Sequence, residues 1–252
     1  MNLDNSQKYP HPFKPLDNPR KLYILFGENG CLSNELTETK PKLEAWISER
    51  PDVPEDSSTW VKILYVGYRD GRKRMFDVNV HGMVELPADD PKARNGQFTF
   101  DGYVIYKYYN RNDEKGVADQ WGKAEHIAGL INAIIEYRET YPDDILDIGD
   151  MRSPTDGKVP KNSKGGLHHG NKGAVDIRVL GKGGSFRGEF TDPRHDLERS
   201  KQFIKAMANN GFTRLFVGRN IYDKLKDCTN SKITVGQDRP GDTTHSNHYH
   251  FD

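Results

Sequence analysis

The chain has 252 residues, which is enough for one large domain or two small ones with a buried core. Lys and Arg together number 37, as do Asp and Glu, so the formal net charge of zero argues against a nucleic-acid-binding protein. The hydrophobic content is 34%, and no apolar run approaches the length of a membrane span, which argues against a membrane protein.

The first 20 residues are polar and rich in proline, and they predict a flexible arm. They contain no apolar segment that could act as a secretory signal, so we expect synthesis in the cytoplasm and no export by the general secretory pathway. The two cysteines, Cys31 and Cys228, are not spaced as metal ligands. Buried free thiols are expected, although the sequence leaves a disulfide between them open.

Strand signals dominate residues 21–115, which we interpret as a β-rich N-terminal domain of unknown role. An apolar run at 21–26 and a Tyr-, Phe- and Val-rich run at 98–108 predict strands. The β-rich runs at 60–66 and 74–80 enclose Asp70-Gly71, a pair typical of a hairpin turn.

One segment of this N-terminal half predicts a helix instead. Within residues 40–50, the apolar side chains of Leu43, Trp46 and Ile47 would share one helix face. We therefore expect a short helix there.

The pattern changes at a polar run over residues 110–116, which predicts a domain boundary. Beyond it, apolar residues recur at the spacing of one helix face, so an amphipathic helix is expected before Pro142. The members of this stripe are Ile127, Leu130, Ile131, Ile134 and Ile135.

Residues 116–252 mix strands and helices without a regular βαβ rhythm. Strands are predicted at 145–150, 174–179 and 213–217, and a second helix at 192–210 with Gly211 as its stop. The fold class is therefore α+β, with an antiparallel sheet and flanking helices preceded by the smaller β-rich domain.

Three of the nine histidines lie at the end of the sequence, at positions 245, 248 and 250. Side chains alternate along a strand, so His248 and His250 would project from the same side of a terminal strand. His245 is out of phase with them and is expected in the turn before that strand. Two adjacent imidazoles suit a divalent metal, above all zinc.

A zinc site needs further ligands, and the Gly-rich loop before the strand at 174–179 offers them. His169 and Asp176 are separated by six residues that include glycines, so a loop histidine and a strand aspartate can converge. With one terminal histidine they form a His-Asp-His set with an open position, as in catalytic zinc sites. Strand geometry leaves open whether His248 or His250 is the ligand and which is the acid/base.

Structural roles compete with this interpretation. Asp176 could form an ion pair with Arg178 within the strand, and His168-His169 could be a solvated pair in the loop. The spacing of all the groups together, His-x6-Asp and then His-x2-His-x-His, favours a metal site.

These motifs resemble the zinc peptidases grouped with lysostaphin, D-Ala-D-Ala metallopeptidases and Hedgehog-type domains, and within that group the penicillin-insensitive murein endopeptidases. The similarity covers about residues 120–252. It lies in the run from Ile148 to Met151 before Pro154 and Gly157, in Gly165-Gly166 before His169, in Phe203–Lys205 through Thr213–Val217, and in the terminal histidines. Two departures are Lys172, where the family has glycine, and His168 directly before the first ligand.

Carried over by position, the resemblance implies that His169, Asp176 and His250 bind one Zn²⁺ per chain. It implies that His248 is the catalytic histidine and that His245 assists it. Asp150, Arg152 and His168 are candidates for substrate binding. For Asp150 and Arg152, a purely structural role is an equal alternative. The loops at 152–173 and 181–193 are expected to form the walls of a groove for the extended substrate peptide.

The function implied is hydrolysis of the D-Ala–diaminopimelate cross-links of bacterial peptidoglycan, with stem peptides as substrate. An enzyme of this kind without a signal peptide would act in the periplasm or cell wall after another route of delivery. An effector injected by a secretion apparatus, with an immunity protein as partner, is slightly favoured over a phage lysis enzyme.

Three other functions are weighed. A D-Ala-D-Ala carboxypeptidase or dipeptidase would use the same metal set. A non-catalytic zinc-dependent binding module would not need both His245 and His248. A metal nuclease could also use clustered histidines, but the neutral charge argues against nucleic acid as a partner.

Overall fold

The structure, a computed structural model, describes residues 42–49, 62–69, 71–109, 120–152, 174–228 and 232–252. The predicted arm at 1–20, the strand at 21–26 and most of the Gly-rich loop, with His168 and His169, lie outside the described residues. Cys31 does as well, and Cys228 carries a free, half-buried thiol. Among the described helices, none combines the length and apolar character needed to cross a membrane.

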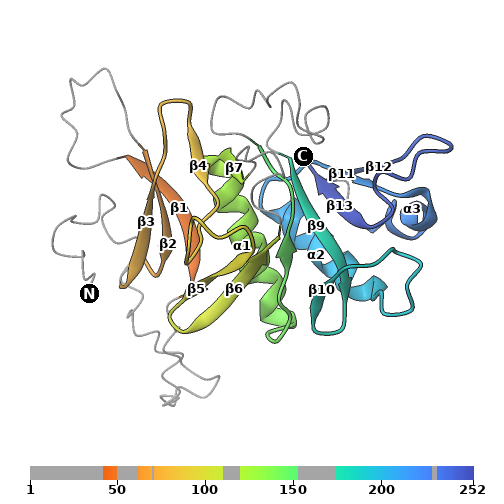
Figure 1. Cartoon of the computed structure of the whole chain (residues 1–252), viewed down its shortest axis with the longest axis horizontal. Coiled ribbons are helices and arrows are strands. Elements are labelled where there is room, and N and C mark those ends of the chain that lie inside the picture. The colour runs from red at the N-terminus through yellow and green to blue at the C-terminus, as the bar shows by residue number, and fades with distance from the viewer. Residues whose placement is uncertain (1–41, 50–61, 70, 110–119, 153–173, 229–231) are drawn as a thin grey trace, which may run out of the picture.

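The first described strands form a three-stranded antiparallel sheet in the order β1-β2-β3 (Figure 1). Its strands are β1 (Glu44–Glu49), β2 (Lys62–Gly67) and β3 (Lys73–Asp77). The antiparallel pairing of β2 with β3 confirms the predicted hairpin.

The expected helix at 40–50 is wrong, because this segment contains strand β1. Its side chains alternate, with Ala45 in the main core and Trp46 on the opposite face, where Trp46 stacks on Tyr65 at 5.3 Å between ring centroids. The side chain of Asn132 also binds the N–H and C=O groups of Ala45 at 2.7 and 2.8 Å. Pairing with β2 and these partners outweigh a weak helical spacing.

The main sheet has eight strands. The order is β12-β11-β13-β9-β8-β6-β5, with β10 paired to β9. Most pairs are antiparallel, as expected, but β11–β12 and β6–β8 are parallel, so the sheet is mixed. The strands are β5 (Gly96–Phe100), β6 (Tyr103–Tyr108), β8 (Asp147–Ile148), β9 (Val175–Gly181), β10 (Gly184–Phe186), β11 (Arg214–Val217), β12 (Thr234–Gln237) and β13 (His248–Phe251).

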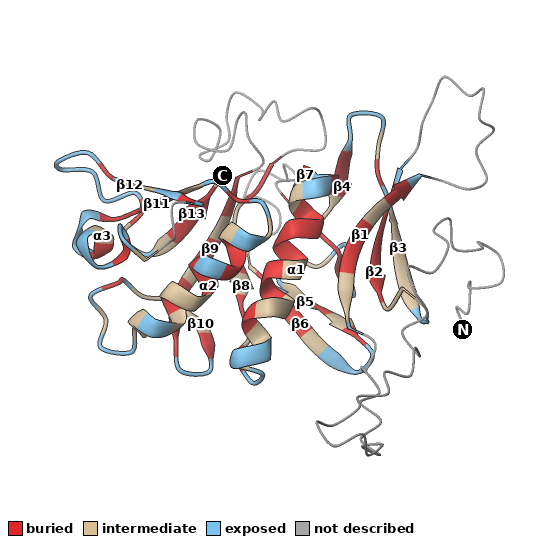
Figure 2. Ribbon diagram, turned by 180° about the vertical axis from the view of Figure 1, so that it is seen from behind, coloured by how far each residue is buried: buried red, intermediate tan, exposed pale blue. Residues whose placement is uncertain are grey.

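Two long helices cover one face of the main sheet (Figure 2). The first, α1 (Ala124–Thr140), buries the predicted apolar stripe apart from Ile135, which is partly buried. The second, α2 (Leu197–Asn209), begins later than expected because the side chain of Asp196 accepts hydrogen bonds from two N–H groups of its first turn. Gly211 follows it with a φ of 98°, as its predicted role as a stop requires.

The remaining elements are short. A third helix, α3 (Arg219–Leu225), follows β11 and was not expected from the sequence. Strands β4 (Met83–Glu85) and β7 (Trp121–Lys123) form a separate two-stranded sheet.

The boundary expected near residue 115 does not coincide with a break in the structure. Strand β6, before it, pairs with β8, after it, and β4 pairs with β7 in the same way. One core cluster includes Phe98 and Tyr106 from the first side and Ile131 and Phe203 from the second. The α+β class is confirmed, and the described parts of both predicted domains share one core.

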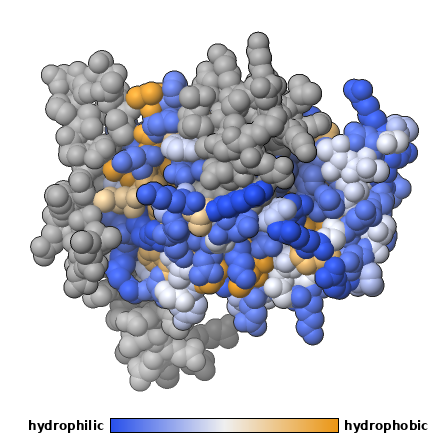
Figure 3. Space-filling model, viewed as in Figure 1, coloured by the Kyte–Doolittle hydropathy of each residue, from blue (hydrophilic) through white to orange (hydrophobic). Residues whose placement is uncertain are grey.

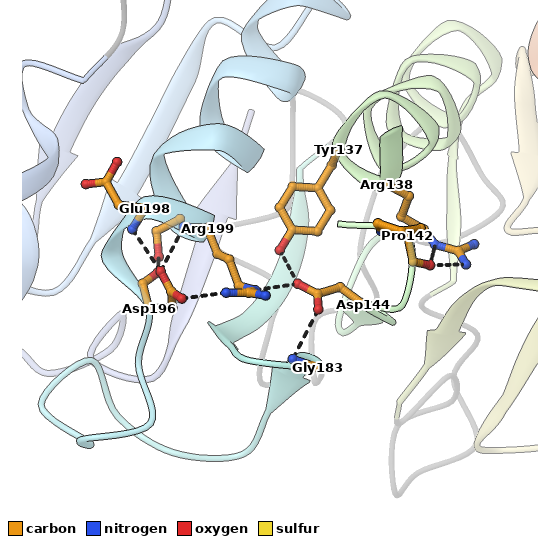
Figure 4. A network of polar contacts seen from close by, with 9 residues as sticks. Tyr137, Arg138, Pro142, Asp144, Gly183, Asp196, Glu198 and Arg199 are labelled. Atoms are coloured by element: carbon orange, nitrogen blue, oxygen red, sulfur yellow. Dashed lines mark hydrogen bonds and ion pairs between the residues drawn. The ribbon is translucent and has the colours of Figure 1, made fainter. Parts of the chain in front are cut away.

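A buried polar network joins the end of α1 to the start of α2 (Figure 4). The carboxylate of Asp144 accepts hydrogen bonds from the Tyr137 hydroxyl at 2.6 Å, from Nε of Arg199 at 2.8 Å and from the backbone N–H of Gly183 at 3.1 Å. Arg199 also binds Asp196, the residue that caps α2. The network therefore fixes the two helices relative to the β9–β10 hairpin.

Candidate active site

The polar face of the main sheet is opposite the helices, and β9 and β13 meet at its centre. In their antiparallel register, His250 is opposite Asp176 and His248 is opposite Arg178. The intervening Ile177 and Tyr249 are buried in the core. Because side chains alternate along a strand, the aspartate, the arginine and both histidines project from the other face. The prediction that His248 and His250 lie on one side is confirmed.

The carboxylate of Asp176 lies between these two histidines. Nδ1 of His250 is 2.9 Å from Oδ1 of Asp176, and Nε2 of His248 is 3.5 Å from Oδ2. Nε2 of His250 is also 3.5 Å from a carboxylate oxygen of Asp252. Each oxygen of Asp176 therefore faces a different imidazole.

The two histidines differ in their environments. Burial lowers the pKa of His248 to about 4, because the nearby charge of Asp176 does not compensate for it. Burial also acts to lower the pKa of His250, but hydrogen bonds to Asp176 and Asp252 outweigh it and raise the pKa to about 9. The side chain of His248 is 13% exposed and that of His250 only 4%, so His248 is the one more open to a substrate.

His245 lies in the turn before β13, as predicted, and is held by a buried aspartate that the sequence did not identify. One oxygen of Asp238 accepts the backbone N–H of His245 at 2.9 Å, and the other pairs with Nδ1 of its ring. The ring centroid of His245 is 5.2 Å from those of His248 and of His250. Three imidazoles therefore form one cluster, and two of them face the carboxylate of Asp176.

Two further residues complete the surroundings of the imidazoles. The ring of Phe216 on β11 lies 6.0 Å from that of His245 and 6.1 Å from that of His250. Asp252 is two residues after His250, a spacing that could have identified it as a neighbour on the same face. No comparable spacing relates Asp238 to the histidines.

The other predicted site residues lie in different surroundings. The N–H of Asp176 donates to the carbonyl of Asp150 at 3.0 Å, and the N–H of Gly149 donates to the carbonyl of Asp176 at 2.7 Å, so this backbone lies against the site. Arg152 pairs through its backbone with Trp121, and its side chain is buried where its charge acts on His126. The structure thus brings Asp150 close to the site and buries Arg152.

Part of the predicted groove wall can also be placed. The N–H of Phe190 donates to the carbonyl of Ser246 at 3.1 Å. The segment 181–193 therefore runs beside the turn that carries His245. The other predicted wall, at 152–173, is outside the described residues except for Arg152.

The side chains of the site include donor groups of the kind that bind a zinc ion. A carboxylate and two imidazole nitrogens converge within 3.5 Å, and these are donor types that zinc prefers. Among the described residues, no group of three His, Cys, Asp or Glu side chains is arranged to hold a metal ion alone. The donor chemistry fits zinc if a ligand such as His169, outside the described residues, completes the set.

Comparison of the chain with protein-family models, curated proteins and solved structures finds no match in any of the three.

Proposed function

We propose that the chain is a zinc-dependent peptidase that hydrolyses the peptide cross-links of bacterial peptidoglycan. The observation that carries this proposal is the position of Asp176, whose two oxygens face His250 and His248 at 2.9 and 3.5 Å on a polar sheet face. The resemblance of the His-x6-Asp and His-x2-His-x-His motifs to murein endopeptidases supports the choice of substrate.

His169, Asp176 and His250 are the proposed ligands of one zinc ion. When bound, zinc would polarise the scissile carbonyl and lower the pKa of a bound water towards ~7. The buried ring of His250 suits a ligand, because the carboxylate of Asp252 can orient Nε2 and leave Nδ1, on the side of Asp176, for the metal.

His248 is the proposed general acid and base. Its imidazole, the more exposed of the pair, accepts a proton from the attacking water and delivers it to the leaving nitrogen. The carbonyl carbon gains the hydroxyl group as its bond to nitrogen breaks, so the products are a carboxylic acid and an amine. His245, oriented by Asp238, assists by stabilising the negative charge that develops on the carbonyl oxygen.

The proposed scissile bond joins D-alanine to diaminopimelate of the neighbouring stem peptide. We propose that the protein acts in the periplasm or cell wall of a target cell, either as an injected effector or as a phage lysis enzyme. If the protein is an injected effector, the producing cell would also make an immunity protein that binds it.

A digest of cross-linked muropeptides tests the proposal. The purified protein is incubated with dimers, with and without a chelator, beside a His248→Ala variant and a His81→Ala control, which removes an exposed histidine far from β13 in the sequence. The products are then weighed by mass spectrometry.

We expect the wild type and His81→Ala to convert dimers to monomers. Chelation and the His248→Ala substitution should each abolish this conversion. Release of terminal D-alanine alone would identify a carboxypeptidase instead. Intact dimers in the presence of zinc-loaded protein would contradict an enzymatic role and favour a binding module.

A further inference from the structure

Arg178 is a cation on the same sheet face as the candidate active site. It lies opposite His248 in the β9–β13 register and two residues after Asp176 on β9. Its Nε atom is buried without a hydrogen-bond partner, and the described residues form no hydrogen bond or ion pair with its guanidinium group. A buried donor without a partner costs free energy, so a ligand that accepts from this guanidinium would be favoured.

A second guanidinium shares an aromatic neighbour with the first. Cζ of Arg178 is 4.4 Å from the ring centroid of Tyr109, and Cζ of Arg187 is 3.8 Å from the same centroid. Stacking on one aromatic ring holds both groups in place. An anion bound beside this ring would be attracted by both positive charges.

Three cations lie near one carboxyl group on the neighbouring strand β8. Lys107, Arg178 and Arg187 all act on the carboxyl group of Asp147 on β8, a half-buried acid whose pKa is raised by burial despite their charges. The nearby carboxylate of Asp176 already faces His248 and His250. Where described residues form this face of the molecule, hydrophilic side chains predominate beside smaller apolar patches (Figure 3).

We infer that Arg178 and Arg187 bind a carboxylate of the substrate peptide next to the bond that is cut. This inference rests on the proposed function and narrows its substrate class to peptides with a free carboxylate near the scissile bond. A guanidinium group matches a carboxylate because its N–H donors form two parallel hydrogen bonds with the two oxygens. Amidation of that carboxylate would remove both the charge and one acceptor.

The test uses two cross-linked stem-peptide dimers that differ only in whether the carboxylates beside the cross-link are free or amidated. The full chain is assayed with both dimers, beside Arg178→Gln, Arg187→Gln and the control Lys182→Gln. Lys182 is exposed in the turn between β9 and β10. Its replacement by Gln makes the same change in net charge as the replacement of an arginine. A thermal melt shows whether Arg178→Gln is unstable. Because Arg187 is exposed, Arg187→Gln is expected to fold in either case.

We expect the wild type and Lys182→Gln to favour the free-carboxylate dimer in kcat/KM by about 10- to 100-fold, the value of a charge-assisted pair of hydrogen bonds. Each arginine variant should lose most of this preference, mainly through a higher KM for the free-carboxylate dimer, and should lose less activity on the amidated dimer. Equal loss on both dimers, or no loss, would overturn the inference.

A binding measurement separates failure of this inference from failure of the proposed function. Calorimetric titration with the two monomeric stem peptides reports recognition of the carboxylate whether or not a dimer is cut. A preference for the free carboxylate that Arg187→Gln abolishes would support the inference even without cleavage. Cleavage of both dimers at equal rates, or equal binding of both monomers, would overturn it.

Discussion

At the residue scale, the pairing of Asp238 with His245 sets the orientation of the imidazole. One oxygen of the carboxylate binds the ring through Nδ1, and the other binds the backbone N–H of the same residue. This arrangement leaves the histidine one ring orientation and directs its second nitrogen away from Asp238. Both side chains are buried, so water does not compete for these bonds.

Replacement of Asp238 by Asn tests this role. The amide can accept only one of the two bonds with its oxygen, so the ring loses its fixed orientation, and kcat should fall about 10- to 100-fold. The measurement is muropeptide cleavage, with zinc content and thermal stability as controls for folding. Asp227→Asn changes an exposed aspartate outside this turn and should leave the rate unchanged. Full activity of a folded Asp238→Asn variant would contradict the assigned role.

His195, outside the site, should make stability depend on pH. Its Nε2 atom is 2.9 Å from Oγ of the buried Ser200, and burial lowers its pKa, with the charge of Lys224 adding to the effect and Asp196 opposing it. In the unfolded chain a histidine has a pKa near ~6.5, so below that pH the unfolded state binds more protons than the folded state. Its contribution to stability is therefore complete above about pH 6.5 and is lost as the pH falls.

A His195→Gln variant checks this contribution. Glutamine can still form a hydrogen bond with Ser200 but does not titrate, so its loss of stability between pH 7.5 and pH 5.5 should be smaller than that of the wild type. Urea unfolding at the two pH values measures the difference. An equal loss in both proteins would show that His195 does not titrate in this range.

At the element scale, Asp144 joins three segments that are distant in sequence. It accepts hydrogen bonds from α1, from the start of α2 and from the β9–β10 turn, and its side chain is almost completely buried (Figure 4). The guanidinium of Arg199 is stacked over Tyr141 at 4.3 Å and also binds Asp196, so it is held in place from several sides. Removal of the acid would leave this cation without its buried partner.

We expect Asp144→Ala to lower the free energy of unfolding by about 3 kcal/mol, because a buried pair is broken from one side. The neighbouring Asp143 is exposed, so Asp143→Ala should change the free energy by less than about 0.5 kcal/mol. Chemical denaturation of both variants gives the comparison. A change at Asp144 as small as that at Asp143 would mean that the network adds nothing to stability.

Elements with a clear periodicity were predictable from the sequence. Helix α1, the β2–β3 hairpin and strand β13 follow from helical spacing, a turn signal and alternation. Helix α3 has only seven residues, and strand β12 has a single apolar side chain in the sequence TVGQ, so neither shows a periodic pattern. Strand β12 forms by parallel pairing with β11. The same limit applies within the site. Alternation predicted His248 and His250 together, whereas Asp238 reaches His245 through a turn that no spacing rule describes.

At the scale of the whole molecule, the two predicted halves share the main sheet and its core. Strands β5 and β6 continue the sheet that carries the site, and Asn132 of α1 binds the backbone of β1. The polar run at 110–116 indicated a domain boundary because polar composition is typical of exposed segments. Composition does not reveal strand pairing between residues on either side of the run, because those residues are distant in sequence. The three-stranded sheet and the site-bearing sheet should therefore unfold together.

We predict one cooperative transition in chemical denaturation, with tryptophan fluorescence and far-UV circular dichroism giving the same midpoint. The zinc concentration must be held constant, because a bound ligand shifts the apparent stability. Two separated transitions would show that the N-terminal half folds independently, as the composition alone indicated.

The most direct test of the central claim is the zinc content of five proteins, measured by elemental mass spectrometry after dialysis against the same buffer. We predict one zinc per chain in the wild type, in His248→Ala and in the surface control His81→Ala, and loss of zinc in Asp176→Ala and His250→Ala. A wild type without bound zinc would contradict the metal site. Zinc retained by His250→Ala but lost by His248→Ala would contradict the assignment of His250 as ligand and His248 as acid and base.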